Sequence, residues 1–235
     1  MITNAPEIRN LWIETLPFFP QDRVHVVLNA VTPAVTPRDV ARKRLTNELR
    51  VPAETLLIGG AGIVTKRKNF ALLLRAFARV RPTNSHLVIV GDGPHRAELE
   101  RLAVELDVRD TVSFMSAREN AAEIIAGLDI FVLSSRNEGM ANVMLEAMAN
   151  GVPVIAADIS GVRTAIGATN ERPAAGWIFS SDNESDLASV MSDAIADIRN
   201  GSPVASAMTR EALWRVDNWF TVENMVAQCE QILFG

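Results

Sequence analysis

Short apolar runs alternate with amphipathic stretches from about residue 55 to residue 199. The apolar runs are continuous, which is typical of strands buried on both faces of a sheet. Between them, apolar residues recur at helical spacing, as in Phe70, Leu73 and Phe77. The pattern predicts strands at Thr55–Gly59, His86–Gly91, Thr111–Phe114, Asp129–Leu133, Pro153–Ala156 and Gly176–Phe179. It predicts helices at Lys68–Arg81, Pro94–Leu106, Arg118–Gly127, Met140–Asn150 and Glu184–Arg199.

This alternation is typical of right-handed βαβ units, so we predict an α/β fold with a doubly wound parallel sheet and flanking helices. Ahead of this unit, Val24–Leu28 has the pattern of one more strand, and residues 31–37 form a proline-punctuated linker. Pro37 then favours the start of a helix that ends near Arg50. Two further helices are predicted after Gly201.

Composition narrows the class of protein. The 235 residues carry a formal net charge of −5 and a single cysteine, Cys229. The negative charge argues against a general nucleic-acid binder, which depends on phosphate neutralisation. One cysteine excludes an intramolecular disulfide and a multi-cysteine zinc site, and is typical of a reducing compartment. No apolar run reaches the roughly 18 residues of a membrane span, and no signal peptide is visible, so we expect a soluble cytoplasmic protein.

Candidate phosphate chemistry follows the first strand of the alternating region. Gly59–Gly62 offers two glycines of a dinucleotide fingerprint, but Thr65 stands where a third small residue belongs, and no acidic residue lies about twenty positions on. The sequence therefore argues against a nicotinamide-dinucleotide site. Lys66, Arg67 and Lys68 instead place three cations at a predicted helix start, against the positive end of its macrodipole. A bound anion such as a diphosphate would relieve that conflict, and an exposed basic turn is the alternative.

A second candidate segment runs from Ser134 to Pro153, with a helix expected to start near Gly139. Gly139 and Ala141 are small, so backbone N–H groups there can approach an anion closely. Glu146 is the only charge in an otherwise apolar helix, and a buried carboxylate needs hydrogen-bond donors such as paired ribose hydroxyls. Glu138 lies eight residues earlier, roughly 12 Å away at the helical rise. A helix cap for Glu138 and a partly exposed surface acid for Glu146 remain the alternatives.

The sequence resembles the nucleotide-sugar-dependent, retaining glycosyltransferases of the GT-B fold (glycosyltransferase family 4, group 1 type) over Asn29 to about Ile198. Glu138 and Glu146 match the Glu-x7-Glu motif of that family. The other matching stretches are Asn29–Thr32, Lys68–Phe70, Leu72–Ala76, Val88–Pro94, Val112–Phe114, Leu128–Ser135, Ala147–Ala149 and Gly151–Ala156.

The resemblance implies a role for each matching residue. Glu138 and Lys68 would be catalytic, with Glu138 at the transferred sugar and Lys68 at the diphosphate charge. Glu146 would hold the donor ribose hydroxyls. The other donor-binding residues would be Gly139, Met140, Ala141, Asn142, Val143, Gly62, Lys66, Phe114 and Met115, with residues 114–116 facing the base. The family needs no metal or other cofactor, and this sequence has no Asp-x-Asp motif.

The sequence departs from the family at several positions. Ile63 stands where the family usually has an arginine that partners the lysine on the diphosphate, and Lys66 or Arg67 could compensate. Ser116 replaces a frequent glycine, and Thr164 replaces a frequent glutamate after the turn at Gly161.

Length is the largest departure, because a full enzyme of the family has an N-terminal acceptor-binding domain of similar size. We therefore interpret residues 1–30 as a remnant of that domain and its hinge, and residues 31–200 as a Rossmann-like, nucleotide-sugar-binding domain. Residues 201–235 would be helices that pack back toward the hinge. Expected partners are a nucleotide sugar, a saccharide or lipid-linked acceptor and the missing N-terminal domain, with peripheral membrane association as an option for the full enzyme.

The resemblance thus predicts the donor-binding half of a hexosyltransferase that is inactive alone. The alternative is a non-catalytic nucleotide-sugar-binding or partner protein derived from such an enzyme.

Overall fold

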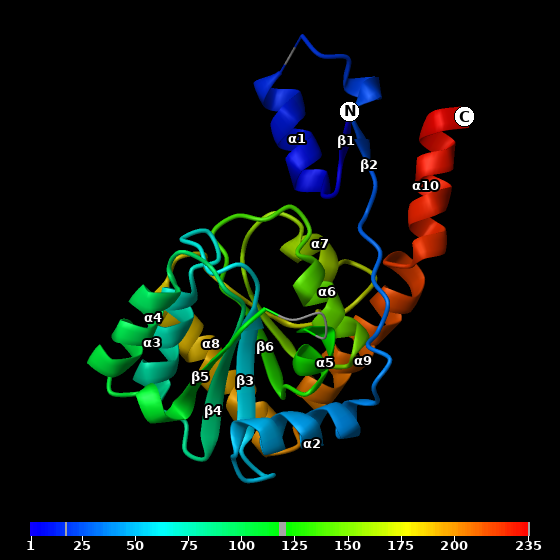
Figure 1. The fold of residues 1–235 in the computed structure, drawn as a ribbon. Coiled ribbons are helices and arrows are strands. Elements are labelled where there is room, and N and C mark those ends of the chain that lie inside the picture. The colour runs from blue at the N-terminus through cyan, green and yellow to red at the C-terminus, as the bar shows by residue number, and fades with distance from the viewer. Residues whose placement is uncertain (17, 118–120, 235) are drawn as a thin grey trace.

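The centre of the protein is a parallel sheet, seen in a computed structural model that describes residues 1–16, 18–117 and 121–234. Within these residues the largest sheet has six strands in the order β5-β4-β3-β6-β7-β8, and all its neighbours pair in parallel. The strands are β3 (Leu56–Ala61), β4 (Ser85–Val90), β5 (Val112–Met115), β6 (Ile130–Leu133), β7 (Val154–Ala157) and β8 (Trp177–Phe179). Each lies within two residues of a predicted strand, so the doubly wound parallel sheet is confirmed (Figure 1).

Helices cover both faces of the sheet. We call residues 27–37, which lead to the first of these helices, the hinge. The helices after the hinge are α2 (Arg38–Leu49), α3 (Phe70–Val80), α4 (Arg96–Glu105), α5 (Ala121–Ala126), α6 (Asn142–Ala149), α7 (Val162–Ile166), α8 (Glu184–Arg199), α9 (Pro203–Trp219) and α10 (Val222–Phe234). One apolar core lies between the sheet and α3, α4 and α8, and another lies between the sheet and α2, α5, α6 and α9. Neighbouring strand residues such as Leu57 and Ile58 enter opposite cores, because side chains alternate along a strand.

The strand order reverses between β3 and β6. β3 pairs with β4 on one side and with β6 on the other, and the chain runs outward in both directions from this point. In open parallel sheets, ligands bind beyond the carboxyl ends of the strands at such a reversal. The fold therefore directs attention to the loops after β3 and β6.

Three predicted helix starts are displaced by two residues, and two of them lie in these loops; the third helix, predicted from Pro94, begins at Arg96. The helix predicted from Lys68 begins at Phe70, because Asn69 has a left-handed backbone (φ +52°) that a helix cannot include. The helix predicted from Met140 begins at Asn142, because Ala141 is extended. Of the predicted helix Arg118–Gly127, the structure shows α5, and residues 118–120 lie outside the described part of the chain.

The sequence prediction missed three short elements: β1 (Ile2–Thr3), α1 (Pro6–Thr15) and α7. β1 pairs in parallel with β2 (His25–Val26), which lies inside the predicted strand Val24–Leu28. The unit β1–α1–β2 lies beyond the carboxyl edge of the large sheet and alongside α10 (Figure 1). Backbone contacts link the hinge to the last helices, with Leu28 N donating to Gln228 Oε1 (3.0 Å) and Val31 N to Phe220 O (2.9 Å).

None of the helices in the described ranges combines the length and the apolar character needed to cross a membrane.

A buried ionic cluster ties α9 to the loop after α7. The Arg215 side chain is 0% exposed, and its guanidinium donates to Glu211 Oε1 (2.8 Å) and to the backbone oxygens of Ala165 (3.0 Å) and Gly167 (2.9 Å). Arg172 donates to both Glu211 oxygens at 2.6 and 2.7 Å. The hydrogen bonds from Arg172 are the main reason that the pKa of Glu211 is lowered. Every polar atom of the Glu211 carboxylate is thus satisfied by an arginine.

We predict that Glu211→Ala lowers the free energy of unfolding at pH 7 by about 3–5 kcal/mol, because it leaves the buried Arg215 charge without its counter-ion. Urea unfolding followed by circular dichroism measures this change. Because the pKa of Glu211 is lowered in the fold, its contribution is present above the ordinary glutamate pKa. The difference between variant and wild type should shrink as pH falls through the lowered pKa.

The matched control for this prediction is Glu230→Ala, which removes an exposed carboxylate from α10 and should change the free energy by less than about 0.5 kcal/mol. Equal stability of the two variants would contradict the prediction.

Candidate functional site

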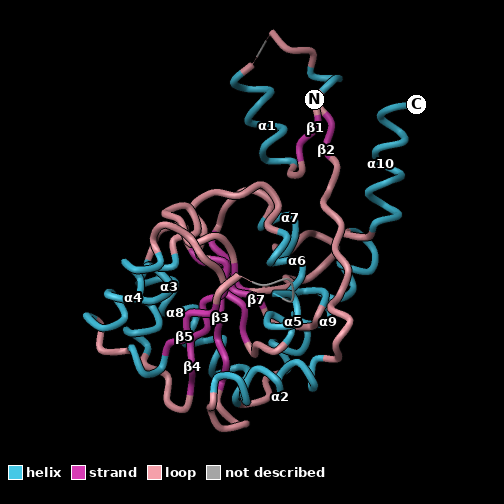
Figure 2. Tube along the Cα trace, in the orientation of Figure 1, coloured by secondary structure: helices cyan, strands magenta, loops and turns pink. Residues whose placement is uncertain are grey.

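Two loops meet at the carboxyl edge of the sheet where the strand order reverses. The first follows β3 and spans residues 62–69, and the second follows β6 and spans residues 134–141. Ser134 Oγ donates to Lys68 O (2.9 Å), and Arg136 N donates to Arg67 O (2.8 Å). Figure 2 shows loops gathered at this edge, below the β1–α1–β2 unit. The two loops therefore form one joined surface.

The carboxylate of Glu138 lies between two cations of the first loop. Lys68 Nζ is 2.9 Å from Glu138 Oε1, and Arg67 Nη1 is 2.8 Å from Glu138 Oε2. The side chains of Lys68 and Glu138 are only 11% and 12% exposed, whereas that of Arg67 is 53% exposed. We inferred from the sequence that a bound anion would relieve the conflict between these cations and the helix start. In this structure Glu138 supplies the negative charge, from a segment 70 residues away that the local sequence could not reveal.

Gly62 allows Lys68 to reach this position. Its backbone has φ +142°, and a Cβ there would lie 2.7 Å from Lys68 Cε. A side chain would be strained by the backbone and would also displace the lysine. Gly62 is thus required by close packing on Lys68, a role that the sequence analysis did not assign to it.

Three side-chain oxygens on these loops lack a well-directed hydrogen bond from the protein. They are Thr65 Oγ1, Ser135 Oγ and Glu138 Oε1, whose contact with Lys68 is an ion pair without hydrogen-bond alignment. Buried polar atoms are normally satisfied, and each unsatisfied one has a cost of about 1–3 kcal/mol. The sequence analysis did not select Thr65 or Ser135, although hydroxyls directly after buried strands could have indicated them. Their presence beside the cations indicates a place for a polar ligand.

Glu146 lies on α6 and faces a different part of the surface. It is half-buried and lines a cavity of about 540 Å³ with the hinge residues 30–35, Ala122, Glu123 and Asn142. In the described residues no hydrogen bond or ion pair to its carboxylate is present. Burial raises the pKa of Glu146. A half-buried, unpaired carboxylate in a cavity is suited to accept hydrogen bonds from a ligand.

The segment Gly139–Ala141 connects the two acidic residues. It precedes α6, so our estimate of 12 Å between Glu138 and Glu146 from the helical rise does not apply. Asn29 of the hinge donates to Met140 O (3.1 Å) and to Asn142 Oδ1 (2.6 Å). Met140 and Ala141 are buried, Asn142 is exposed and Val143 packs against the core. The hinge thus contacts the segment that precedes α6 and also lines the cavity of Glu146.

The other predicted residues lie in separate hollows. Phe114 and Met115 line one with Glu48, Arg96 and Ser116, at the edge strand β5, and share no lining residue with the cavity of Glu146. Lys66 is exposed and lines another of about 280 Å³ with Thr65, His95 and Arg136. The structure therefore does not bring these three residues together with Glu146.

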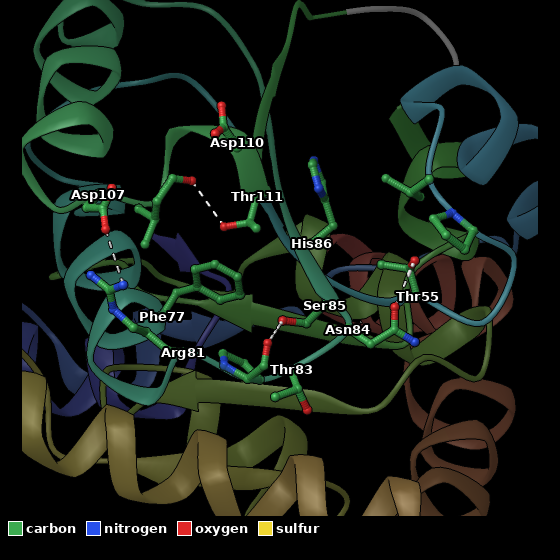
Figure 3. Close-up of a pocket in the computed structure, with 14 residues that line it drawn as sticks. Thr55, Phe77, Arg81, Thr83, Asn84, Ser85, His86, Asp107, Asp110 and Thr111 are labelled. Atoms are coloured by element: carbon green, nitrogen blue, oxygen red, sulfur yellow. Dashed lines mark hydrogen bonds and ion pairs between the residues drawn. The ribbon is translucent and has the colours of Figure 1, made fainter.

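A hollow of about 470 Å³ also lies at the opposite, amino-terminal edge of the sheet (Figure 3). Its polar groups are largely satisfied within the protein. Arg81 pairs with Asp107 (3.4 Å), Ser85 Oγ donates to Pro82 O (2.5 Å) and His86 Nε2 lies 2.8 Å from Ser113 Oγ. Burial lowers the pKa of His86. This hollow lies at the amino ends of the strands, whereas ligands bind at the carboxyl ends in open parallel sheets. The buried oxygens that lack a hydrogen-bond partner among the described residues lie on the loops of the carboxyl edge.

Comparison with known proteins identifies the family of this chain. Residues 53–197 match the family described as Glycosyl transferases group 1. The chain is 40% identical over 114 residues to the lipopolysaccharide core biosynthesis glycosyltransferase LpsD of Rhizobium meliloti, which covers 48% of this chain and 33% of LpsD. It is 34% identical over 194 residues to a D-inositol 3-phosphate glycosyltransferase of Stackebrandtia nassauensis, which covers 75% of this chain and 42% of that protein.

Solved structures share the fold. Anabaena HepE in complex with UDP aligns with a TM-score of 0.85 and 20% identity over 99% of this chain and 62% of HepE. A glycosyltransferase from Rickettsia africae aligns with a TM-score of 0.86 and 17% identity over 100% of this chain and 63% of that protein. This chain therefore spans less than two thirds of each of these relatives. Since the family match covers more than half of its residues, the chain belongs to the group 1 glycosyl transferases and has the Rossmann-like GT-B fold of their C-terminal domain.

Proposed function

We propose that this protein binds a nucleoside diphosphate sugar at the carboxyl edge of its sheet and provides the donor half of a retaining glycosyl transfer. The observation that carries this proposal is the group of Lys68, Arg67 and Glu138 at the strand reversal, beside hydroxyls without protein partners. The proposal also draws on the relatives, because HepE was crystallised with UDP and with UDP and glucose.

The cations would act on the diphosphate. Lys68 and Arg67 already lie at a carboxylate, so an arriving diphosphate would meet fixed positive charge in a largely buried place. Such charge stabilises the leaving diphosphate as its negative charge grows in the transition state. Glu138 would then share these cations with the diphosphate and accept hydrogen bonds from hydroxyls of the transferred sugar. The backbone of Gly139–Val143 would lie along the sugar and diphosphate.

Glu146 would accept the ribose hydroxyls in the cavity beside the hinge. An unpaired carboxylate with a raised pKa gains most from two hydroxyl donors, which replace the water lost on burial. We further propose that binding needs no metal ion, because Lys68 and Arg67 supply cationic charge for the diphosphate. Phe114 and Met115 line a different hollow from Glu146. They would therefore face the base only if the two hollows moved closer together or if the nucleotide extended from one to the other.

The acceptor side would come from outside this chain. Since the chain spans 62% of HepE, we propose that an N-terminal domain binds a saccharide or lipid-linked acceptor and completes the enzyme. We further propose that the complete enzyme acts in the cytoplasm, where it could associate peripherally with the membrane. A non-catalytic nucleotide-sugar-binding protein is the second candidate. It is favoured by Ile63, which is 64% exposed in the loop after β3 and offers no charge to a diphosphate.

We predict that a nucleoside diphosphate binds in the presence of EDTA and that Glu146→Gln weakens it about fivefold or more, since a hydrogen bond to a charged group contributes about 1 kcal/mol more than one to a neutral amide. Calorimetry with UDP, GDP and ADP measures this. The ligand-free variant should have a higher Tm at pH 7, because burial raises the pKa of Glu146 and penalises its charged form. The gain should disappear at acidic pH, where Glu146 is protonated in the folded protein.

The control for Glu146 is Glu230→Gln on α10, which should alter neither affinity nor Tm. Unchanged nucleotide affinity in Glu146→Gln would remove the ribose role.

A second prediction concerns the cations. Lys68→Ala should weaken nucleoside diphosphate binding at least tenfold while changing the affinity for the free nucleoside less than threefold, because the charge acts on phosphate. Ile63→Arg should strengthen diphosphate binding by adding a cation beside the same loop. Lys43→Ala, which removes an exposed lysine from α2, is the matched control. An equal loss for nucleoside and diphosphate in Lys68→Ala would show that Lys68 acts through the fold.

A third prediction concerns catalysis by the chain alone. We expect the purified 235-residue chain to bind the donor but not to transfer sugar, because positioning of the acceptor can contribute roughly 7–11 kcal/mol to barrier lowering. Radiolabelled nucleotide sugars incubated with saccharide and lipid-linked acceptors test this. Multiple-turnover transfer would contradict it and would indicate a site completed between copies of the chain.

A further inference from the structure

Asn4 lies at the carboxyl end of β1, the first strand of the small N-terminal unit. That unit stands over the loops at the carboxyl edge of the large sheet (Figure 1). Two sets of parallel strands therefore point their carboxyl ends toward the same space. Because polar side chains at these ends commonly bind ligands, Asn4 is placed to add a group to the site from the opposite side.

The Asn4 amide lies directly against Gly139. A Cβ on Gly139 would be 2.1 Å from Asn4 Oδ1 and 3.0 Å from Asn4 Cγ, so only the bare backbone of glycine leaves room for the amide. Gly139 directly follows Glu138, whose carboxylate pairs with Lys68 and Arg67, so Asn4 lies against the backbone of the loop that carries this carboxylate. In the described residues the Asn4 side chain has no hydrogen-bond partner. It is a neutral amide with free donors and acceptors at the backbone of the site loop.

Neighbouring contacts fix the position of Asn4. Thr3 and Ala5, on either side, are buried. Glu7 of α1 accepts hydrogen bonds from Gly161 N (3.2 Å) and from Thr164 Oγ1 (3.1 Å) at the start of α7.

The start of α7 is itself packed against the site loop. A Cβ on Gly161 would lie 2.1 Å from Gly139 O, so the backbones of these two glycines touch. Three segments of the chain therefore meet at Gly139, and the Asn4 amide is held there by the contacts of its neighbours.

We propose that the Asn4 amide hydrogen-bonds to the transferred sugar of the bound nucleoside diphosphate sugar. The contact would be made from the side of Gly139 on which the β1–α1–β2 unit lies. This inference rests on the proposed function. An amide both donates and accepts, which suits the hydroxyls of a sugar ring, whereas it offers little to a diphosphate. Glu138, next to Gly139, only accepts hydrogen bonds when ionised, so the two side chains would read different hydroxyls of one ring. Asn4 is thus a substrate-contacting residue for the sugar and not for the nucleotide.

The test compares the affinities of Asn4→Ala and the wild-type chain for UDP and for UDP-glucose by calorimetry, replaced by the GDP or ADP pair if the nucleotide screen selects that base. We expect UDP-glucose binding to weaken about three- to tenfold, the worth of one or two hydrogen bonds, with UDP binding unchanged within twofold. Asn10→Ala, which removes an exposed asparagine from α1 of the same unit, should change neither affinity. Thermal unfolding of each variant checks that the fold persists.

The outcomes separate this inference from the proposed function. If wild type binds no nucleoside diphosphate, the proposed function fails and the Asn4 contact fails with it. If wild type binds UDP and Asn4→Ala leaves both affinities unchanged, Asn4 only packs on Gly139 and the inference is wrong while the function stands. An equal loss for UDP and UDP-glucose would also overturn it, because it would show displacement of Gly139 and not loss of a sugar contact. Asn4→Leu, of similar shape and without charge, provides the second variant and should also weaken UDP-glucose selectively, since it loses the donors and the acceptor of the amide.

Discussion

The pairing of β3 with β6 is the constraint on which the rest of this structure depends. Because the chain leaves β3 in one direction and returns through β6 to build the sheet in the other, the two following loops separate from their neighbours and meet each other. The helix α3 follows β3 and the helix α6 follows β6, and the two pack on opposite faces of the sheet. Each contributes to a separate apolar core. The loops after β3 and β6 are where the charged residues Lys68, Arg67 and Glu138 gather.

Within that space, charge is balanced between segments that are distant in sequence. Lys68 and Arg67 on one loop hold Glu138 on the other, and Glu138 in turn satisfies cations that the start of α3 would otherwise repel. The ion pairs fix the position of all three side chains. An arriving anion therefore competes with Glu138 for Lys68 and Arg67. Its binding free energy is the difference between pairing these cations with Glu138 alone and pairing them with both Glu138 and the anion.

Parts of the site are maintained at a cost to stability. Among the residues that the structure describes, Glu146 is half-buried without a partner, and Thr65 and Ser135 hold buried hydroxyls without a hydrogen bond. The Glu211–Arg215 cluster shows the opposite solution, in which every carboxylate oxygen is paired. The satisfied cluster under α9 thus has a structural role, whereas the unsatisfied groups at the carboxyl edge support the binding role that we propose for that edge.

The sequence by itself determined the elements of the sheet and the family, because continuous apolar runs and helical spacing are local signals; α8 has the predicted bounds Glu184–Arg199. It also identified Glu138, Glu146 and Lys68 as candidates, through spacing and isolation of charge. Only the tertiary structure decided that Glu138 pairs with Lys68, that Glu146 faces the hinge, and that Asn4 reaches Gly139. These contacts join residues 70 to more than 130 positions apart, and no local periodicity encodes them, since they arise only when the strand order brings separate loops to one edge.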